Sequence, residues 1–197
     1  MSAVIAEKFD SAEEYLALER AADYKSEYVA GCIYAMAGAS REHILITFNI
    51  SRSLGNQLAD RPCEIYPTEM RVKPAHARSY RYPDIAVVCG AAEFEDQHTD
   101  TLLNPTLLIE VLSPSTEAND RGEKFAEYRR IPSLREYVLV KQDQPRIEHY
   151  ARQGAGWFLT VAEGLDASVA LEAIGCTLEL REVYRRVLDE ADVADRE

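Results

Sequence analysis

The stretch that decides the fold runs from Tyr82 to Tyr128 and contains YPDIAVVCG (82–90), LLIEVLSPST (107–116) and DRGEK (120–124). Two apolar runs each carry one carboxylate: Asp84 precedes the first run, and Glu110 lies inside the second. A carboxylate in an apolar strand is costly unless it has a partner. The stretch therefore predicts two buried strands whose acids share a partner.

A divalent cation is the simplest partner for two converging carboxylates. Mg²⁺ takes oxygen ligands, often one or two protein carboxylates together with waters and phosphate oxygens. Asp84 and Glu110 could supply these ligands, and the carbonyl of Val111 could add a third oxygen. The alternative is that Asp84 is an ordinary turn residue, whereas Glu110 is flanked by apolar residues and is improbable as a buried, unpaired acid.

Lys124 is the candidate cation beside this pair. Asp120, Lys124 and Tyr128 are spaced at i, i+4 and i+8, so they share one face of the helix expected over residues 119–130. An ammonium aimed at the acids could stabilise the charge that develops on a phosphate group during cleavage. The alternative is a plain ion pair between Asp120 and Lys124 on the helix surface.

The order of the elements predicts an α/β fold, a mixed sheet flanked by helices. Hairpin strands are expected near the N-terminus and antiparallel strands near the C-terminus. A capping box at Ser11 and Glu14 begins the first helix. The other expected helices cover residues 41–58, 119–130 and 178–188, and a helical turn with a loop covers 90–104. The expected strands cover residues 26–29, 32–36, 64–66, 70–72, 82–89, 106–112, 135–140, 146–151 and 157–162.

Length and composition limit the number of domains and the class of protein. The 197 residues predict a single domain, 1–197, with a core of about 8–188 and a disordered tail at 189–197. No apolar run is long enough to span a bilayer, and the first residues do not resemble a secretory signal. We therefore expect a cytoplasmic protein with no membrane partner.

The net charge is −12, from 22 basic and 34 acidic residues. This balance argues against broad, non-specific binding of nucleic acid. The sign reverses locally in the stretch leading to Asp84, which contains Arg71, Lys73, Arg78 and Arg81 and no acid. These side chains could contact phosphates and position a nucleic acid. The alternative is an ordinary solvated loop.

The four cysteines, Cys32, Cys63, Cys89 and Cys176, lie far apart and form no CxxC pair. A zinc site and a disulfide framework are therefore not expected. Buried free thiols are the prediction.

The quoted motifs resemble a known class of nucleases. Pro83-Asp84, then Glu110, then a lysine is similar to the PD-(D/E)XK nuclease signature. The run IEVLSPST (109–116), followed by DRGEK (120–124) and Tyr128, resembles the Uma family of restriction-endonuclease-like proteins. The resemblance covers residues 8–188.

The resemblance implies a restriction-endonuclease-like core and cleavage of DNA phosphodiester bonds with Mg²⁺, for which Mn²⁺ could substitute. Asp84 and Glu110 become metal ligands and Lys124 the catalytic lysine. Glu27 matches an early glutamate of the family and would complete the acidic cluster. One departure stands out, because Leu112 occupies the position where the general signature has its lysine.

Two other functions fit the same residues. The chain could be a nuclease-like module of weak activity that binds nucleic acid or a protein, or an enzyme that acts on RNA. A homodimer would suit cleavage of both strands of a duplex, although no sequence feature demonstrates one.

Overall fold

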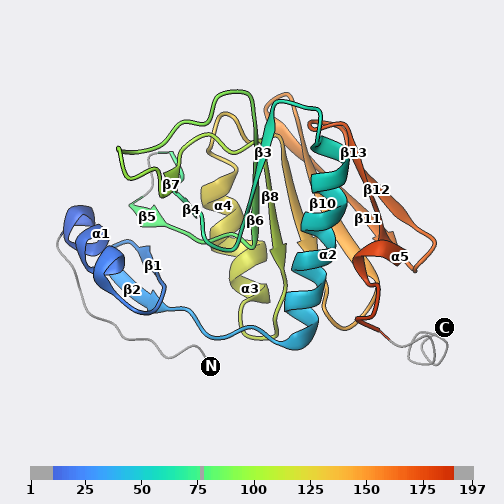
Figure 1. The fold of residues 1–197 in the computed structure, drawn as a ribbon, viewed down its shortest axis with the longest axis horizontal. Helices are drawn as coiled ribbons and strands as arrows, with labels where there is room; N and C mark the ends of the chain where they lie inside the picture. The colour runs from blue at the N-terminus through green and yellow to red at the C-terminus, as the bar shows by residue number, and fades with distance from the viewer. Residues whose placement is uncertain (1–10, 76–77, 189–197) are drawn as a thin grey trace.

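The computed structural model describes residues 11–75 and 78–188 (Figure 1). The predicted disorder of residues 189–197 lies outside this range. Six strands form the central sheet, in the order β11-β10-β9-β8-β6-β3. The neighbours β8 and β9 are parallel, and the other neighbours in this sheet are antiparallel. The predicted mixed α/β sheet is therefore confirmed.

The elements have the following bounds. The helical segments are α1 (Ala12–Ala21), α2 (Arg41–Leu58), α3 (Glu117–Asn119), the π-helical turn η1 (Asp120–Lys124), α4 (Phe125–Tyr128) and α5 (Leu180–Val183). The strands of the central sheet are β3 (Cys63–Pro67), β6 (Ile85–Cys89), β8 (Leu107–Val111), β9 (Glu136–Val140), β10 (Arg146–Gln153) and β11 (Gly156–Glu163). The shorter pairings use β1 (Ser26–Val29), β2 (Cys32–Ala35), β4 (Arg71–Val72), β5 (Ser79–Tyr80), β7 (Thr101–Leu102), β12 (Ser168–Leu171) and β13 (Cys176–Glu179).

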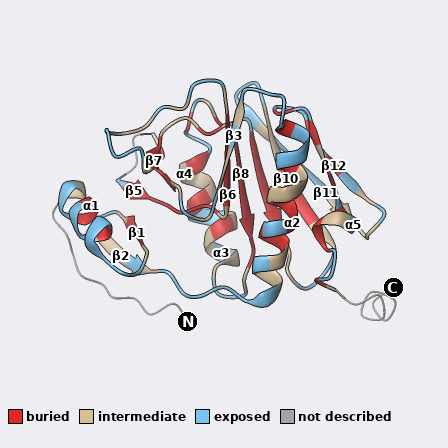
Figure 2. Cartoon of the chain, in the orientation of Figure 1, coloured by how far each residue is buried: buried red, intermediate tan, exposed pale blue. Residues whose placement is uncertain are grey.

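Each face of the sheet is covered by a different helix, and the central strands β6 and β8 are buried (Figure 2). On one face, α2 contributes Ile46, Ile50 and Leu54 to a cluster with Ile85 and Ile109. On the other face, Tyr128, Ala86 and Leu108 belong to a second cluster. Successive strand residues point to opposite faces, so Glu110 lies on the face that carries the α3–η1–α4 helix, and Asp84 directly precedes β6.

The strand register brings the two predicted acids together. In the antiparallel pair β6–β8, Ile85 lies opposite Ile109 and Ala86 opposite Leu108. Extending this register by one residue places Asp84 opposite Glu110. The acids are 26 positions apart in the sequence, but they face each other across one strand pair.

The N-terminal hairpin is confirmed and has a defined turn. Ala30 and Gly31 join β1 to β2 with φ angles of 50° and 94°, the left-handed geometry of a two-residue hairpin turn. The predicted cap at Ser11 forms, since its side chain accepts a hydrogen bond from the Glu14 amide. Ser40 caps α2 in the same way and accepts a hydrogen bond from the His43 amide. Helix α2 has the predicted bounds.

Two sequence-based predictions of local structure were wrong. Residues 90–104 contain no helix but include β7. The helix expected over 178–188 is reduced to α5, because residues 176–179 form β13 against β12. Alternate residues of these strands, Val169, Leu171 and Leu178, are buried. Short apolar runs fit both helical and strand spacing, and here cross-strand pairing decides.

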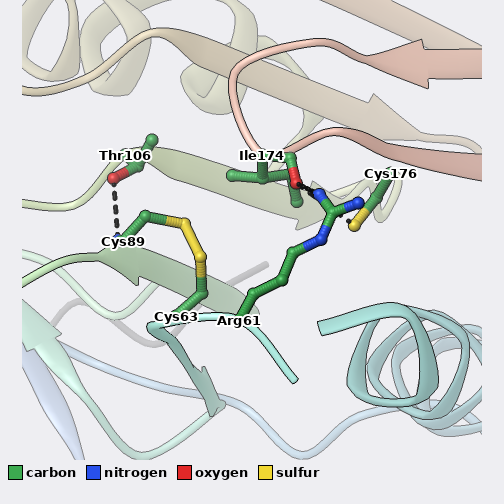
Figure 3. Close-up of a disulfide and its surroundings, with 6 residues drawn as sticks. All are labelled: Arg61, Cys63, Cys89, Thr106, Ile174 and Cys176. Carbon is green, nitrogen blue, oxygen red and sulfur yellow. Dashed lines mark hydrogen bonds between the residues drawn. A yellow bond between two sulfur atoms is a disulfide. The ribbon is translucent and has the colours of Figure 1, made fainter. Parts of the chain in front are cut away.

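The prediction of four free cysteines was also wrong. Cys63 and Cys89 form a disulfide between β3 and β6 (Figure 3). The two residues are direct cross-strand partners, with a Cα–Cα distance of 4.0 Å. Cys32 and Cys176 are free, as predicted. Disulfides are rare in reducing compartments, so this bond weighs against the expected cytoplasmic location. Among the described residues, no helix is long and apolar enough to cross a membrane.

Removing this disulfide should destabilise the protein. The bond closes a loop with a sequence separation of 26 residues, and the chain-entropy model gives a stabilisation of about 3.5 kcal/mol for a loop of that size. We expect Cys63→Ala/Cys89→Ala to lower the free energy of unfolding in urea by that amount. Cys176→Ala is the control for loss of a thiol. An unchanged midpoint in the double variant would contradict the prediction.

Candidate active site

Asp84 directly precedes β6 and is held by two neighbours. The amide of Val111 donates a hydrogen bond of 2.7 Å to Asp84 Oδ2, and His43 Nε2 lies 2.9 Å from Asp84 Oδ1. In an extended strand the N–H and C=O of one residue point to the same side. The carbonyl of Val111 therefore faces the Asp84 side of β8, where it was predicted to supply a third oxygen.

Lys124 lies among three carboxylates. Its Nζ is 3.2 Å from Glu110 Oε1, 3.2 Å from Glu27 Oε1 and 3.3 Å from Asp120 Oδ1. The hydroxyl of Tyr128 donates a 3.2 Å hydrogen bond to Glu110. All five side chains are buried. The predicted helix face of Asp120, Lys124 and Tyr128 therefore points at Glu110, and the surface ion pair between Asp120 and Lys124 is excluded as an alternative.

This cluster contains more acids than cations. Burial raises the pKa of Glu110 well above its ordinary value, and Asp120, Asp84 and Glu27 add to this effect against the opposing charge of Lys124. Burial also raises the pKa of Asp120. Burial alone would lower the pKa of Lys124, but the surrounding carboxylates outweigh it and raise that pKa well above its usual range. The ammonium of Lys124 is therefore kept charged.

Glu27 connects the N-terminal hairpin to the cluster. Besides Lys124, it accepts hydrogen bonds from Arg81 Nη1 at 3.0 Å and from the Tyr82 amide at 3.1 Å. Burial would raise the pKa of Glu27, but Lys124, Arg81 and the Tyr82 amide together lower it. The structure thus brings Glu27 together with Glu110 and Lys124, as the resemblance implied.

Two of the four basic residues in the stretch before Asp84, Arg71 and Arg81, have a structural role in this conformation. Arg71 and Arg81 are each 2% exposed; Arg71 pairs with Asp100, and Arg81 pairs with Glu27 and Glu127. Their burial contradicts the predicted phosphate contact for these two residues, because a guanidinium enclosed in internal ion pairs is not open to a ligand. Lys73 pairs with Glu95, and Arg78 is exposed. For Lys73 and Arg78 a phosphate contact stays a prediction.

The donor set is compatible with magnesium but is not a complete cage. Within residues 11–75 and 78–188, no three His, Cys, Asp or Glu side chains converge to hold an ion. Mg²⁺ needs only one or two carboxylates if waters complete its shell, and Asp84, Glu110 and the Val111 carbonyl meet that need. Asp120 Oδ1 is buried and has no hydrogen-bond partner. It forms only an ion pair with Lys124 Nζ, at 3.3 Å. This excess of carboxylate oxygen fits a divalent cation.

His43 is a residue of the site that the sequence does not single out. Its ring contacts Asp84 on one side. On the other side, Gln142 Nε2 lies 3.4 Å from His43 Nδ1 and donates 2.8 Å to the carbonyl of Leu112. The residues come from α2 and from the segment after β9, and no local sequence signal links them. Only the packing of α2 on the sheet brings His43 to the site.

Comparison with known proteins places this chain in a family. The sequence profile of Uma2, described as "Putative restriction endonuclease", matches residues 12–181. The chain belongs to the Uma2 family. The resemblance found in the sequence is therefore confirmed, and the chain is nuclease-like at the level of its family.

Two proteins of Synechocystis sp. (strain ATCC 27184 / PCC 6803 / Kazusa) are related to this Uma2 chain. "Uncharacterized protein sll1609" is 41% identical over 170 residues, which cover 86% of this chain and 96% of that protein. "Uncharacterized protein slr1290" is 35% identical over 175 residues, which cover 89% and 91%. Their names give no activity, so they support the family alone.

A solved structure shares the mixed α/β fold of the Uma2 chain. The crystal structure of a "putative nuclease belonging to DUF820" from Anabaena variabilis ATCC 29413 superimposes with a TM-score of 0.74. The match covers 89% of this chain and 98% of the other, at 19% sequence identity. At that identity the likeness concerns the fold.

Proposed function

We propose that this Uma2 protein is a metal-dependent endonuclease that hydrolyses phosphodiester bonds in DNA. The observation that carries the proposal is that Asp84, bonded to the Val111 amide, lies next to Glu110, which in turn pairs with Lys124. Two acids opposed across a strand pair can hold a cation, and a buried ammonium lies 3.2 Å from the second acid. Family membership supports the same class of reaction.

Each residue has a distinct part in the proposed reaction. Asp84, Glu110 and the Val111 carbonyl would hold Mg²⁺ or Mn²⁺. When bound, such an ion polarises a phosphate oxygen and lowers the pKa of a coordinated water. Lys124 stabilises the negative charge that develops on the phosphate. Glu27 and Tyr128 are positioning residues, since Glu27 binds Lys124 and Tyr128 binds Glu110.

Incubation with supercoiled plasmid tests this function directly. Nicked or linear product is expected with Mg²⁺ or Mn²⁺, and none is expected with excess chelator. Structured RNA in a parallel reaction separates a deoxyribonuclease from a ribonuclease. Calorimetric titration with Mn²⁺ supplies the second readout. Metal binding without cleavage of either polymer would reject the enzyme and favour the binding module.

Loss of the His43 side chain should weaken metal binding and cleavage without abolishing them. The ring orients Asp84 through the 2.9 Å contact to Oδ1, and loss of a group that orients a metal ligand typically costs about 10–100-fold in affinity or activity. We expect His43→Ala to lower Mn²⁺ affinity and cleavage within that range. His98→Ala is the control, since His98 is an exposed histidine on the loop before β7. Equal losses in both variants would contradict a positioning role for His43.

A further inference from the structure

A pocket lies at the other end of the helix that carries Lys124. It has a volume of about 530 Å³ and is lined by residues of α4, the turn after it, β10 and β11, including Phe125, Arg129, Arg130, Tyr150, Arg152 and Trp157. That volume lies within the range of small-ligand sites, about 300–1,000 Å³. The pocket does not include Asp84, Glu110 or Lys124 and is separate from the candidate active site.

The pocket concentrates positive charge in an acidic chain. Arg129 and Arg130 are exposed, and neither forms an ion pair within the part of the chain that the structure describes. Arg135, just beyond them, is also exposed and unpaired there. Burial, and then repulsion from Arg135, lower the pKa of Arg152. Since the chain as a whole carries −12, this uncompensated group of arginines is suited to an anionic ligand.

The aromatic side of the pocket is held rigidly. Arg152 donates to the carbonyls of Leu134 at 2.7 Å, Arg129 at 2.7 Å and Ile131 at 2.9 Å. Its guanidinium carbon lies 4.6 Å from the centre of the Trp157 ring, and Phe125 meets the same ring edge-on, with 5.4 Å between ring centres. Arg152 is therefore a positioning residue that fixes Trp157, while Arg129 and Arg130 keep their donors available.

We infer that this pocket binds a single-stranded segment of nucleic acid, with phosphates on Arg129 and Arg130 and a base against Trp157. A strand alternates a planar ring with a phosphate, and proteins that bind single strands combine a basic groove with aromatic rings. The bases of a duplex are stacked on each other and do not expose their faces in this way. The choice of nucleic acid as the ligand class rests on the proposed function.

The only tryptophan of the chain is Trp157, so its fluorescence reports on the pocket itself. The probe is a short oligothymidylate, titrated in chelator so that cleavage cannot run. We expect saturable quenching and a stronger affinity at low salt. In Arg129→Gln/Arg130→Gln the affinity should fall about tenfold or more, and its salt dependence should weaken, because two phosphate contacts are lost.

The matched control is Arg181→Gln/Arg185→Gln, which removes the same charge. Arg181 pairs with Asp166 and Arg185 with Glu182, away from the pocket. The control should bind the oligonucleotide like the unaltered protein. The thermal unfolding midpoints of the two double variants should agree, because all four side chains are on the surface. Absence of quenching, equal weakening in both pairs, or equal quenching by inorganic phosphate would overturn the inference.

A separate plasmid assay with Mg²⁺ distinguishes the two proposals. Cleavage without quenching by the oligonucleotide leaves the proposed function standing and rejects the pocket. Quenching by the oligonucleotide without cleavage of the plasmid supports the pocket and rejects the proposed function. Quenching that depends on protein concentration but not on oligonucleotide indicates that a second copy of the chain occupies the pocket, which also rejects the inference.

Discussion

Asp84→Asn is expected to lower the rate of DNA cleavage by on the order of a thousandfold, comparable to the loss of one strong electrostatic stabiliser of a transition state. The substitution removes the negative charge that would hold the metal but keeps an oxygen in place. That oxygen can still accept the 2.7 Å hydrogen bond from the Val111 amide. The free energy of unfolding should therefore fall by only about 1 kcal/mol.

Three measurements together test this expectation. Plasmid cleavage gives the rate, calorimetry gives Mn²⁺ affinity, and urea denaturation gives stability. Asp166→Asn is the control, since its side chain is 92% exposed and lies outside the site. If Asp84→Asn cleaved DNA at the unaltered rate, the assignment of Asp84 as a metal ligand would be wrong.

Lys124→Met should abolish cleavage and also destabilise the protein. Methionine fills similar space, but it leaves Glu27, Glu110 and Asp120 without the ammonium that they share. Removing one member of a buried ion pair costs about 3–5 kcal/mol, because the remaining charge has no partner. We expect a loss of that size near neutral pH, together with loss of cleavage.

The stability of Lys124→Met should depend on pH. Burial already raises the pKa of Glu110 and Asp120, and loss of the opposing ammonium raises both pKa values further. A carboxyl whose pKa is raised on folding favours the folded state below its unfolded pKa, which is 4.5 for Glu110 and 3.8 for Asp120. This advantage disappears as the pH rises through the folded pKa. Denaturation at several pH values should therefore show the smallest deficit in acid.

A double variant separates the catalytic role of Lys124 from its structural role. Lys124→Met/Glu110→Gln removes one cation and one anion, so it should recover part of the lost stability. It should not recover cleavage, because both the ammonium and a proposed metal ligand are absent. Recovery of cleavage would show that Lys124 has only a structural role.

The main features of the site could be predicted because they depend on local spacing. Asp84 and Glu110 stand out in the sequence as acids beside apolar runs. Helical spacing places Asp120, Lys124 and Tyr128 together. The π-helical turn η1 interrupts this helix, yet all three residues are buried around Glu110. Short-range periodicity is therefore enough to identify the two acids and the lysine.

Other features depend on which strands become neighbours, which local spacing does not encode. Cys63 and Cys89 are joined because β3 pairs with β6 in one register. Arg81 is buried because the hairpin brings Glu27 to it from 54 positions away. His43 reaches Asp84 only after α2 packs on the sheet. The apolar alternation in β12 and β13 was equally compatible with a helix until their pairing was known.

The position of Lys124 on a helix has a further consequence. Leu112, where the general signature has its lysine, is buried in the apolar cluster under α4, so β8 ends without a cation of its own. The sheet alone carries the two acids, and the ammonium arrives only when residues 117–128 dock on it. A complete site therefore requires the docked side of this local equilibrium, and local opening of a segment can require less free energy than global unfolding. Hydrogen exchange of the η1 amides would measure that equilibrium.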